Sequence, residues 1–219
     1  EKAFINMNTF FVNILCFSPP KSMKMENFIE NLDYKDVKIE EFVEGTMINL
    51  FCYNNTWLCS TKGTIHAKCK FFRDYPKTFR ALFLEATESC KLEFGMLNPE
   101  YCYSFILQHP ENRIVVPFSR KNLVLTNMYK CTNINVESID LVNIPGVEIS
   151  YAKTIANIYE SYKGESFPDL FDYFSSQNID YKNMGIVLNY DGKRSKIWTP
   201  NYLKVNSLRG NNPKIQFQY

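Results

Sequence analysis

The sequence is poor in the residues that build metal sites. It has only two histidines, and its seven cysteines are scattered with no C-x-x-C pair. Structural zinc sites draw their ligands from clustered cysteine and histidine, so we expect no metal site. An odd number of scattered cysteines among apolar neighbours is instead typical of small core residues in a reducing compartment such as the cytoplasm.

Long apolar runs are also missing. The longest run, around residues 10–17, is too short to span a bilayer, and no segment has the pattern of a signal peptide. We therefore expect no contact with a membrane. The first residue is Glu1 rather than Met, so we expect the sequence to be a fragment of a longer chain.

An excess of one charge is absent as well. Lys and Arg total 25 against 23 Asp and Glu, which gives a net charge of +2. Proteins that bind the phosphate backbone of a nucleic acid are usually more basic. Only a local basic strip would therefore indicate nucleic-acid binding here. Aromatic residues are plentiful at 16%. They supply buried area for a core, and some rings could remain free to stack on bases.

Alternating apolar and polar positions dominate the chain and predict a core of antiparallel strands. Strands are expected at 10–17, 38–42, 46–53, 56–60, 102–108, 113–118, 123–129, 185–190, 195–198 and 201–205. Helices are expected at 76–89, 154–162 and 167–175, with hairpin turns at Asn54-Asn55 and Asp191-Gly192. This order predicts an α+β fold in a single domain over 1–219.

Three segments resemble, in the right order, the motifs of covalent nucleotidyltransferases, and most of all those of phage-type, ATP-dependent RNA ligases. The K-x-D-G segment and the T-R-G turn of these ligases resemble EFVEGTM at 41–47 and STKG at 60–63. The F-E-x-x-x-P-x-N-R-I-V segment resembles YSFILQHPENRIV at 103–115. The E-G-x-V strand and the K-x-K strand resemble MGIV at 184–187 and KIW at 196–198. The chain also resembles uncharacterised ligase-like proteins of large DNA viruses.

The resemblance implies an antiparallel-sheet nucleotidyltransferase core, an ATP-grasp-like ligase adenylation fold flanked by helices. In this family a lysine attacks the α-phosphate of ATP, acidic residues orient the ribose and a metal ion, and further lysines neutralise phosphate. The residues that the resemblance assigns to nucleotide binding are Glu44, Gly45, Lys62, Arg113 and Lys196. We expect Glu44, Arg113 and Lys196 to converge on one cleft.

Four charged positions of the family carry apolar residues here. The nucleophile position holds Phe42, the two acidic positions hold Ile106 and Met184, and the second lysine of the last motif is replaced by Trp198. Phenylalanine has no nucleophilic atom, so no catalytic residue is assigned. An unpaired charge in a pocket without its ligand is costly, so apolar replacement fits a pocket that is filled or has another use. Phe42, Met184 and Trp198 are expected to fill the adenine cleft.

Three functions stay open from the sequence, and whether the chain is an enzyme stays open with them. The first is a catalytically inactive ligase-fold domain that serves as a binding or structural module, without a cofactor. Its expected ligands are protein partners, with RNA or a nucleotide as alternatives. RNA would meet the remaining basic groups Lys62, Arg113, Lys193, Arg194 and Lys196.

The second function is an active RNA ligase with a displaced nucleophile, which would require ATP and Mg²⁺. The fallback lysines are Lys38, on the same strand as Phe42, and Lys62. The third is an unrelated α+β interaction protein of a larger assembly. Few residues follow Val205, so the C-terminal specificity domain usual in such ligases is not expected in this chain. The viral resemblance adds the virion or the infected cytoplasm as a location.

Overall fold

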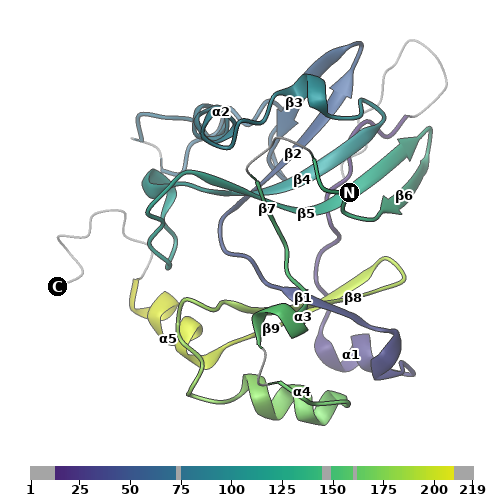
Figure 1. The fold of residues 1–219 in the computed structure, drawn as a ribbon, viewed down its shortest axis with the longest axis vertical. Coiled ribbons are helices and arrows are strands. Elements are labelled where there is room, and N and C mark those ends of the chain that lie inside the picture. Colours follow the sequence, from purple (N-terminus) through teal and green to yellow (C-terminus); the bar gives the residue numbers. More distant parts are fainter. Residues whose placement is uncertain (1–12, 73–74, 145–148, 160–161, 210–219) are drawn as a thin grey trace. The chain divides into compact units, whose positions relative to one another are not determined.

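The computed structural model describes residues 13–72, 75–144, 149–159 and 162–209, which form two compact units (Figure 1). Of the described residues, the first unit comprises 13–19, 45–72, 75–113, 118–144 and 149–151, and the second comprises 20–44, 114–117, 152–159 and 162–209. The α+β class with antiparallel sheets is confirmed, whereas the single domain over 1–219 stays a prediction. Among the described helices, none is long and apolar enough to cross a membrane.

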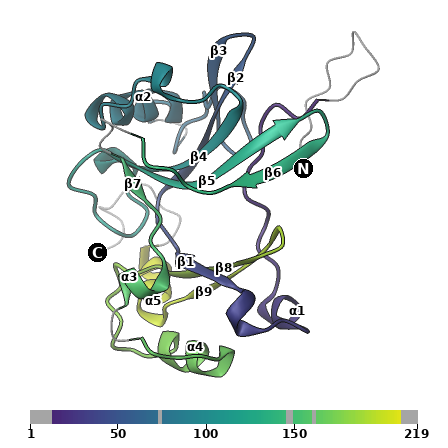
Figure 2. The ribbon, with the colours of Figure 1, turned by 45° about the vertical axis from the view of Figure 1, so that its right-hand side comes forward.

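The first unit is built on a twisted sheet with strand order β3-β2-β4-β5-β6, and the short β7 lies parallel to β5. The strands are β2 (Thr46–Tyr53), β3 (Thr56–Ser60), β4 (Tyr101–Gln108), β5 (Asn122–Thr132), β6 (Asn135–Ile139) and β7 (Ser150–Tyr151). Helix α2 (Phe79–Ser89) covers one face of this sheet (Figure 2). Two short 3₁₀ turns, η2 (Phe94–Met96) and η3 (Pro110–Asn112), follow α2 and β4.

The core of the first unit follows from strand alternation. Ile48 and Leu50 on β2 pack with the buried α2 residues Leu82 and Phe83, while Asn49 between them points to the opposite face. The β2–β3 turn is tight because both of its residues have positive φ, 48° at Asn54 and 58° at Asn55. The predicted hairpin is thereby confirmed.

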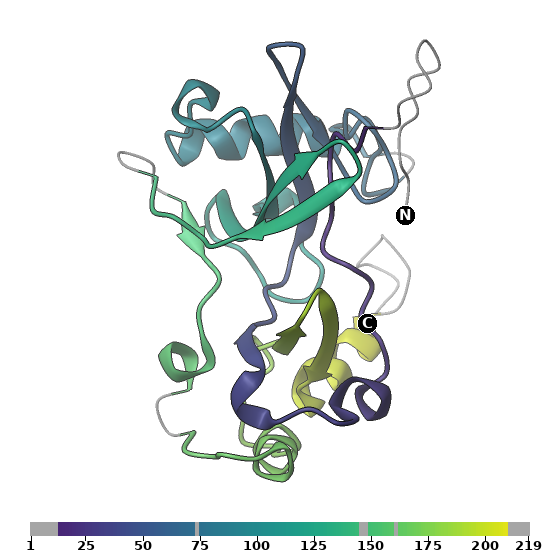
Figure 3. The same ribbon diagram turned by 90° about the vertical axis from the view of Figure 1, so that its right-hand side faces the viewer.

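The second unit has a three-stranded sheet with the order β1-β8-β9. Its elements are α1 (Met25–Ile29), η1 (Tyr34–Asp36), β1 (Lys38–Glu41), α3 (Ile155–Ile158), α4 (Phe167–Phe174), β8 (Gly185–Tyr190), β9 (Lys193–Trp198) and α5 (Pro200–Arg209). Figure 3 shows α1 in purple, α4 in green and α5 in yellow around this sheet. Phe28 of α1 and Phe174 of α4 pack on Ile39, Ile186 and Leu188, which form the sheet side of the core.

Two predicted strands are wrong for identifiable reasons. Residues 113–118 form no ladder, because the N–H groups of Val115 and Val116 donate to a carboxylate instead of a neighbouring strand. Residues 201–205 belong to helix α5, whose first residue is Pro200. Proline suits the first helical turn since it has no N–H to donate there.

Three further boundaries differ from the prediction. Of the strand expected at 10–17, residues 10–12 lie outside the described residues, and 13–17 are irregular. Helix α2 begins at Phe79 rather than near Pro76, because the Thr78 side chain accepts the Ala81 N–H at 3.2 Å and caps the helix. The helix expected at 154–162 is described only over Ile155–Ile158, with 160–161 outside the described residues.

Candidate functional site

Three aromatic rings pack together where β1 and β9 end in the second unit. Phe42 directly follows β1, and its N–H donates to the Gly185 carbonyl at 3.0 Å. Trp198, the last residue of β9, is the ladder partner of Gly185. The Phe42 and Trp198 ring centroids are therefore only 4.7 Å apart, with an interplanar angle of 64°. Tyr202 of α5 stacks on Trp198 with a centroid distance of 5.5 Å. We call Phe42, Trp198 and Tyr202 the aromatic cluster.

The Lys196 ammonium lies on the aromatic cluster. Its Nζ is 4.6 Å from the Trp198 centroid and 5.2 Å from the Phe42 centroid. Burial, helped by the nearby Arg194 charge, lowers the pKa of Lys196 below its ordinary value. Cation–π attraction to the two rings offsets part of that desolvation. The resemblance implies that the Lys196 charge binds phosphate, whereas in the structure this charge lies over the rings of Phe42 and Trp198.

At two motif positions, Gly45 and Gly185, a neighbouring segment lies so close to the backbone that there is no room for a Cβ atom. Gly185 has φ of +138°, and a Cβ there would collide with the Ile197 carbonyl across the β8–β9 ladder. Gly45 has φ of +144°, and a Cβ there would lie 2.5 Å from both Ile106 Cγ2 and the Leu107 carbonyl oxygen. Both positions require glycine for backbone reasons alone, whether or not a nucleotide binds.

Glu44 forms hydrogen bonds within the second unit. Its side chain is buried, and its Oε1 accepts the backbone N–H groups of Val115 and Val116, each at 2.8 Å. Hydrogen bonds from two amides stabilise a carboxylate that would otherwise be costly to bury. Glu44 therefore positions the segment 114–117, a role that sequence reasoning did not anticipate because the two partners lie about 70 residues apart in the chain.

The two fallback lysines are engaged elsewhere. Lys38 Nζ pairs with Glu40 at 2.9 Å, and the same carboxylate accepts from Asn189 Nδ2 at 3.0 Å. Lys38 begins β1, whereas Phe42 follows the last residue of that strand. In the first unit, Lys62 Nζ donates to the Pro19 carbonyl at 3.2 Å. Lys196, which the sequence did not propose as a nucleophile, has its Nζ 5.2 Å from the centroid of the Phe42 ring.

The remaining predicted residues are divided between the two units. Ile106 is buried in β4 between Met47 and Val124, and Arg113 follows η3 with an exposed side chain. Both belong to the first unit. Met184 precedes β8 in the second unit, where its carbonyl accepts the Thr199 N–H. Of the predicted residues, the structure brings together Phe42, Trp198 and Lys196, while the convergence of Glu44, Arg113 and Lys196 stays a prediction.

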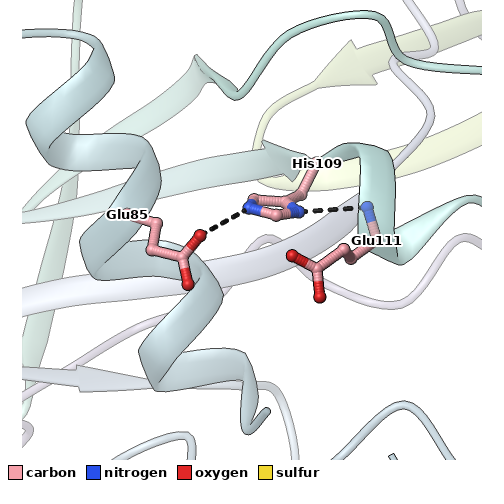
Figure 4. Close-up of side chains that lie close together, drawn as sticks. All are labelled: Glu85, His109 and Glu111. Atoms are coloured by element: carbon pink, nitrogen blue, oxygen red, sulfur yellow. Dashed lines mark hydrogen bonds and ion pairs between the residues drawn. The ribbon is translucent and has the colours of Figure 1, made fainter. Parts of the chain in front are cut away.

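A second polar group lies in the first unit and was not predicted. The side chains of Glu85, His109 and Glu111 approach within 4.8 Å of one another (Figure 4). Buried His109 accepts the Glu111 N–H at Nδ1 and lies 3.3 Å from Glu85 Oε2 through Nε2. Lys77 lies 2.7 Å from both carboxylates, and Lys121 lies 2.7 Å from Glu85. The two lysines pair with the carboxylates, so in the structure this group is an ion-pair network that holds η3.

We expect this network to make stability fall on acidification in two steps. Burial lowers the pKa of His109, so the unfolded chain takes up a proton below about pH 6.5 before the folded protein does. Hydrogen bonds from Lys121 and Lys77 lower the pKa of Glu85 to about 2. Its contribution is complete above about pH 4.5 and is lost as the pH falls toward 2.

Urea unfolding of the wild type and of two variants between pH 8 and pH 3 measures this effect. We expect His109→Gln to reduce the fall in the free energy of unfolding just below pH 6.5. Glu85→Gln should reduce the fall below pH 4.5. Glu88→Gln, an exposed residue of the same helix, is the matched control and should keep the wild-type profile. A wild-type profile in the Glu85 variant would contradict the assignment.

The comparisons with known proteins find similar chains among ligases. A curated RNA ligase of Rhodothermus phage RM378 is 32% identical over 112 residues, which cover 48% of this chain and 24% of the phage protein. A solved Naegleria gruberi RNA ligase mutant without ligand matches with a TM-score of 0.56 at 12% identity, over 93% of this chain and 63% of that one. No protein-family model matches the chain.

A third relative extends the comparison to DNA ligases. A protein of Aquifex aeolicus predicted to be an ATP-dependent DNA ligase matches with a TM-score of 0.50 at 14% identity, over 96% of this chain and 57% of that one. The chain thus spans less than two thirds of each of these relatives. The expected resemblance is confirmed at the level of fold and likeness: the chain is RNA-ligase-like and has a ligase nucleotidyltransferase fold.

Proposed function

We propose that the chain is a catalytically inactive, RNA-ligase-like nucleotidyltransferase-fold domain that acts as a binding or structural module. The observation that carries the proposal is the aromatic cluster. Phe42 stands at the position that the resemblance gives to the nucleophile, and its ring packs on Trp198 and on the Lys196 ammonium. The packing of a side chain without a nucleophilic atom at this position supports an inactive assignment.

The residues present do not fit the ligands of an active ligase. A solved Naegleria gruberi RNA ligase mutant holds ATP and Mn. Acidic side chains orient such a metal, but the two positions expected to supply them hold Ile106 and Met184, and Ile106 is buried within β4. Lys196, the one lysine of the last motif that is present, lies over the rings of Phe42 and Trp198. We therefore derive no step through ATP or a metal ion.

The alternative is an active enzyme with a displaced nucleophile, and one observation favours a specific lysine for it. Lys196 Nζ lies 5.2 Å from the Phe42 centroid, and burial lowers the pKa of this amine. A lower pKa raises the fraction of neutral amine, which is the form that attacks phosphorus. Lys196 therefore replaces Lys38 and Lys62 as the first residue to test for this alternative.

The test is incubation of the purified chain with α-labelled ATP and Mg²⁺ or Mn²⁺, followed by a denaturing gel. An active RNA ligase treated in parallel is the positive control. We expect no covalent label on this chain. A parallel filter-binding measurement with labelled ATP and labelled single-stranded RNA reads binding without transfer, and protein partners are sought if neither ligand is retained.

A covalent label would overturn the inactive assignment, and substitutions would locate it. Lys196→Arg keeps the charge near the rings but is not expected to form a nucleotide adduct. Lys193→Arg, at the exposed start of the same strand, is the matched control. Loss of label in the first variant and not in the second would place the nucleophile at Lys196. Lys38→Arg and Lys62→Arg complete the set.

A further inference from the structure

A pair of cysteine thiols joins an N-terminal segment to the sheet of the first unit. Cys16 Sγ lies 3.5 Å from Cys102 Sγ on β4 and 3.8 Å from Ser60 Oγ on β3. We infer that Cys16 and Cys102 are a site of oxidative cross-linking, where a disulfide ties the segment Leu15–Pro19 to β4. This inference does not depend on the proposed function.

The segment is already held on the sheet by contacts of the two residues that follow Cys16. Phe17 packs edge-on against Tyr129 of β5, with ring centroids 5.0 Å apart. The Phe17 carbonyl accepts the Cys102 thiol at 3.4 Å, and Ser18 Oγ accepts from Asn49 Nδ2 at 2.5 Å. A disulfide bond is about 2.0 Å long, so closure needs the two sulfur atoms to approach by roughly 1.5 Å. The chain around them is positioned for that approach.

The two cysteine residues differ in their exposure to solvent, and from this difference we assign the order of the two steps. Cys102 is only 2% exposed, and its hydrogen bond with Cys16 together with burial raises the pKa of its thiol. Cys16 is half-buried and is the sulfur that an oxidant reaches. Its thiolate attacks the O–O bond of a hydroperoxide, which forms a sulfenic acid and releases water or an alcohol.

The second step closes the bond. Cys102 sulfur attacks the sulfenic sulfur of Cys16, its proton leaves with the hydroxyl group as water, and the S–S bond forms. In sum, the two thiols lose two protons and two electrons, and the hydroperoxide accepts both. Cys131 packs in the same cluster, but burial raises the pKa of its thiol to about 11, and it serves as the internal comparison.

The cross-link is read by mass spectrometry on the intact folded chain. Reductant is removed, the protein is treated with hydrogen peroxide, remaining thiols are alkylated, and trypsin is added without reduction. Cleavage after lysine and arginine places Cys16 in peptide 3–21, Cys102 in peptide 92–113 and Cys131 in peptide 131–153, each as its only cysteine. We expect the linked pair of peptides 3–21 and 92–113, which disappears on reduction.

Two variants and a melting measurement complete the test. Cys131→Ser should keep the linked pair, and Cys16→Ser should lose it, with circular dichroism confirming that both variants are folded. The oxidised wild type should melt about 5 °C or more above the reduced protein, since the bond closes a long loop, and Cys16→Ser should show no such rise. Absence of the linked pair in folded wild type, or a link from Cys102 to Cys131 instead, would overturn the inference.

Discussion

Gly185→Ala is expected to lower the free energy of unfolding by about 3 kcal/mol or more. The residue has φ of +138°, a region that side chains other than glycine rarely adopt, and the added Cβ would collide with the Ile197 carbonyl. The collision is with backbone, so no side-chain rotation relieves it. Because Gly185 also accepts the Phe42 N–H and pairs with Trp198, the substitution should disturb the aromatic cluster.

Urea unfolding followed by tryptophan fluorescence measures both effects, because Trp198 reports on the cluster. Gly192→Ala is the matched control, at the turn that joins β8 to β9. Its φ is +70°, and nothing lies within 4 Å of the added Cβ, so only the backbone term of about 1 kcal/mol remains. Equal losses of unfolding free energy in the two variants would show that the collision with the Ile197 carbonyl does not add to the destabilisation.

Glu44→Ala is expected to cost about 2–4 kcal/mol, the second large effect. The substitution removes the acceptor of two backbone N–H groups, and Val115, which carries one of them, is 2% exposed. Glu44→Gln should cost less, since an amide oxygen still accepts hydrogen bonds but carries no charge. The expected order of stability is therefore wild type, then the glutamine variant, then the alanine variant.

Amide hydrogen exchange at Val115 and Val116 gives the local test of the Glu44 prediction. Both amides should exchange faster in Glu44→Ala than in the wild type, by more than the change in global stability alone explains. Glu26→Ala, at an exposed position of α1, is the control for the loss of a surface carboxylate. If Glu44→Ala were no more harmful than Glu26→Ala, the two hydrogen bonds would not stabilise the fold.

Local pattern was enough for the elements whose contacts are close in sequence. The predicted bounds of β2, β3 and β8 agree with the structure, because alternation and the turn pairs Asn54-Asn55 and Asp191-Gly192 specify hairpins within a few residues. Phe42 and Trp198 lie together because both residues pair with Gly185, while their filling of an adenine cleft with Met184 stays a prediction.

Features that depend on distant partners were not predictable in this way. The strand pattern of 113–118 is overridden by the Glu44 carboxylate, and the strand pattern of 201–205 is overridden by a helix start at Pro200. The position of the Lys196 ammonium depends on side-chain packing after the strands have paired, which periodicity does not encode. The same holds for the pairing of Lys38 with Glu40.

The seating of Lys196 on two rings has a consequence for how this sequence can evolve. A single change of Phe42 to lysine would remove one of the rings that hold the ammonium and set a second positive charge beside it. Positions 106 and 184 hold Ile106 and Met184, so no carboxylate at either position would offset the added charge. A lysine at position 42 would therefore be tolerated only together with further replacements around it, and the aromatic cluster restricts which single substitutions this site accepts.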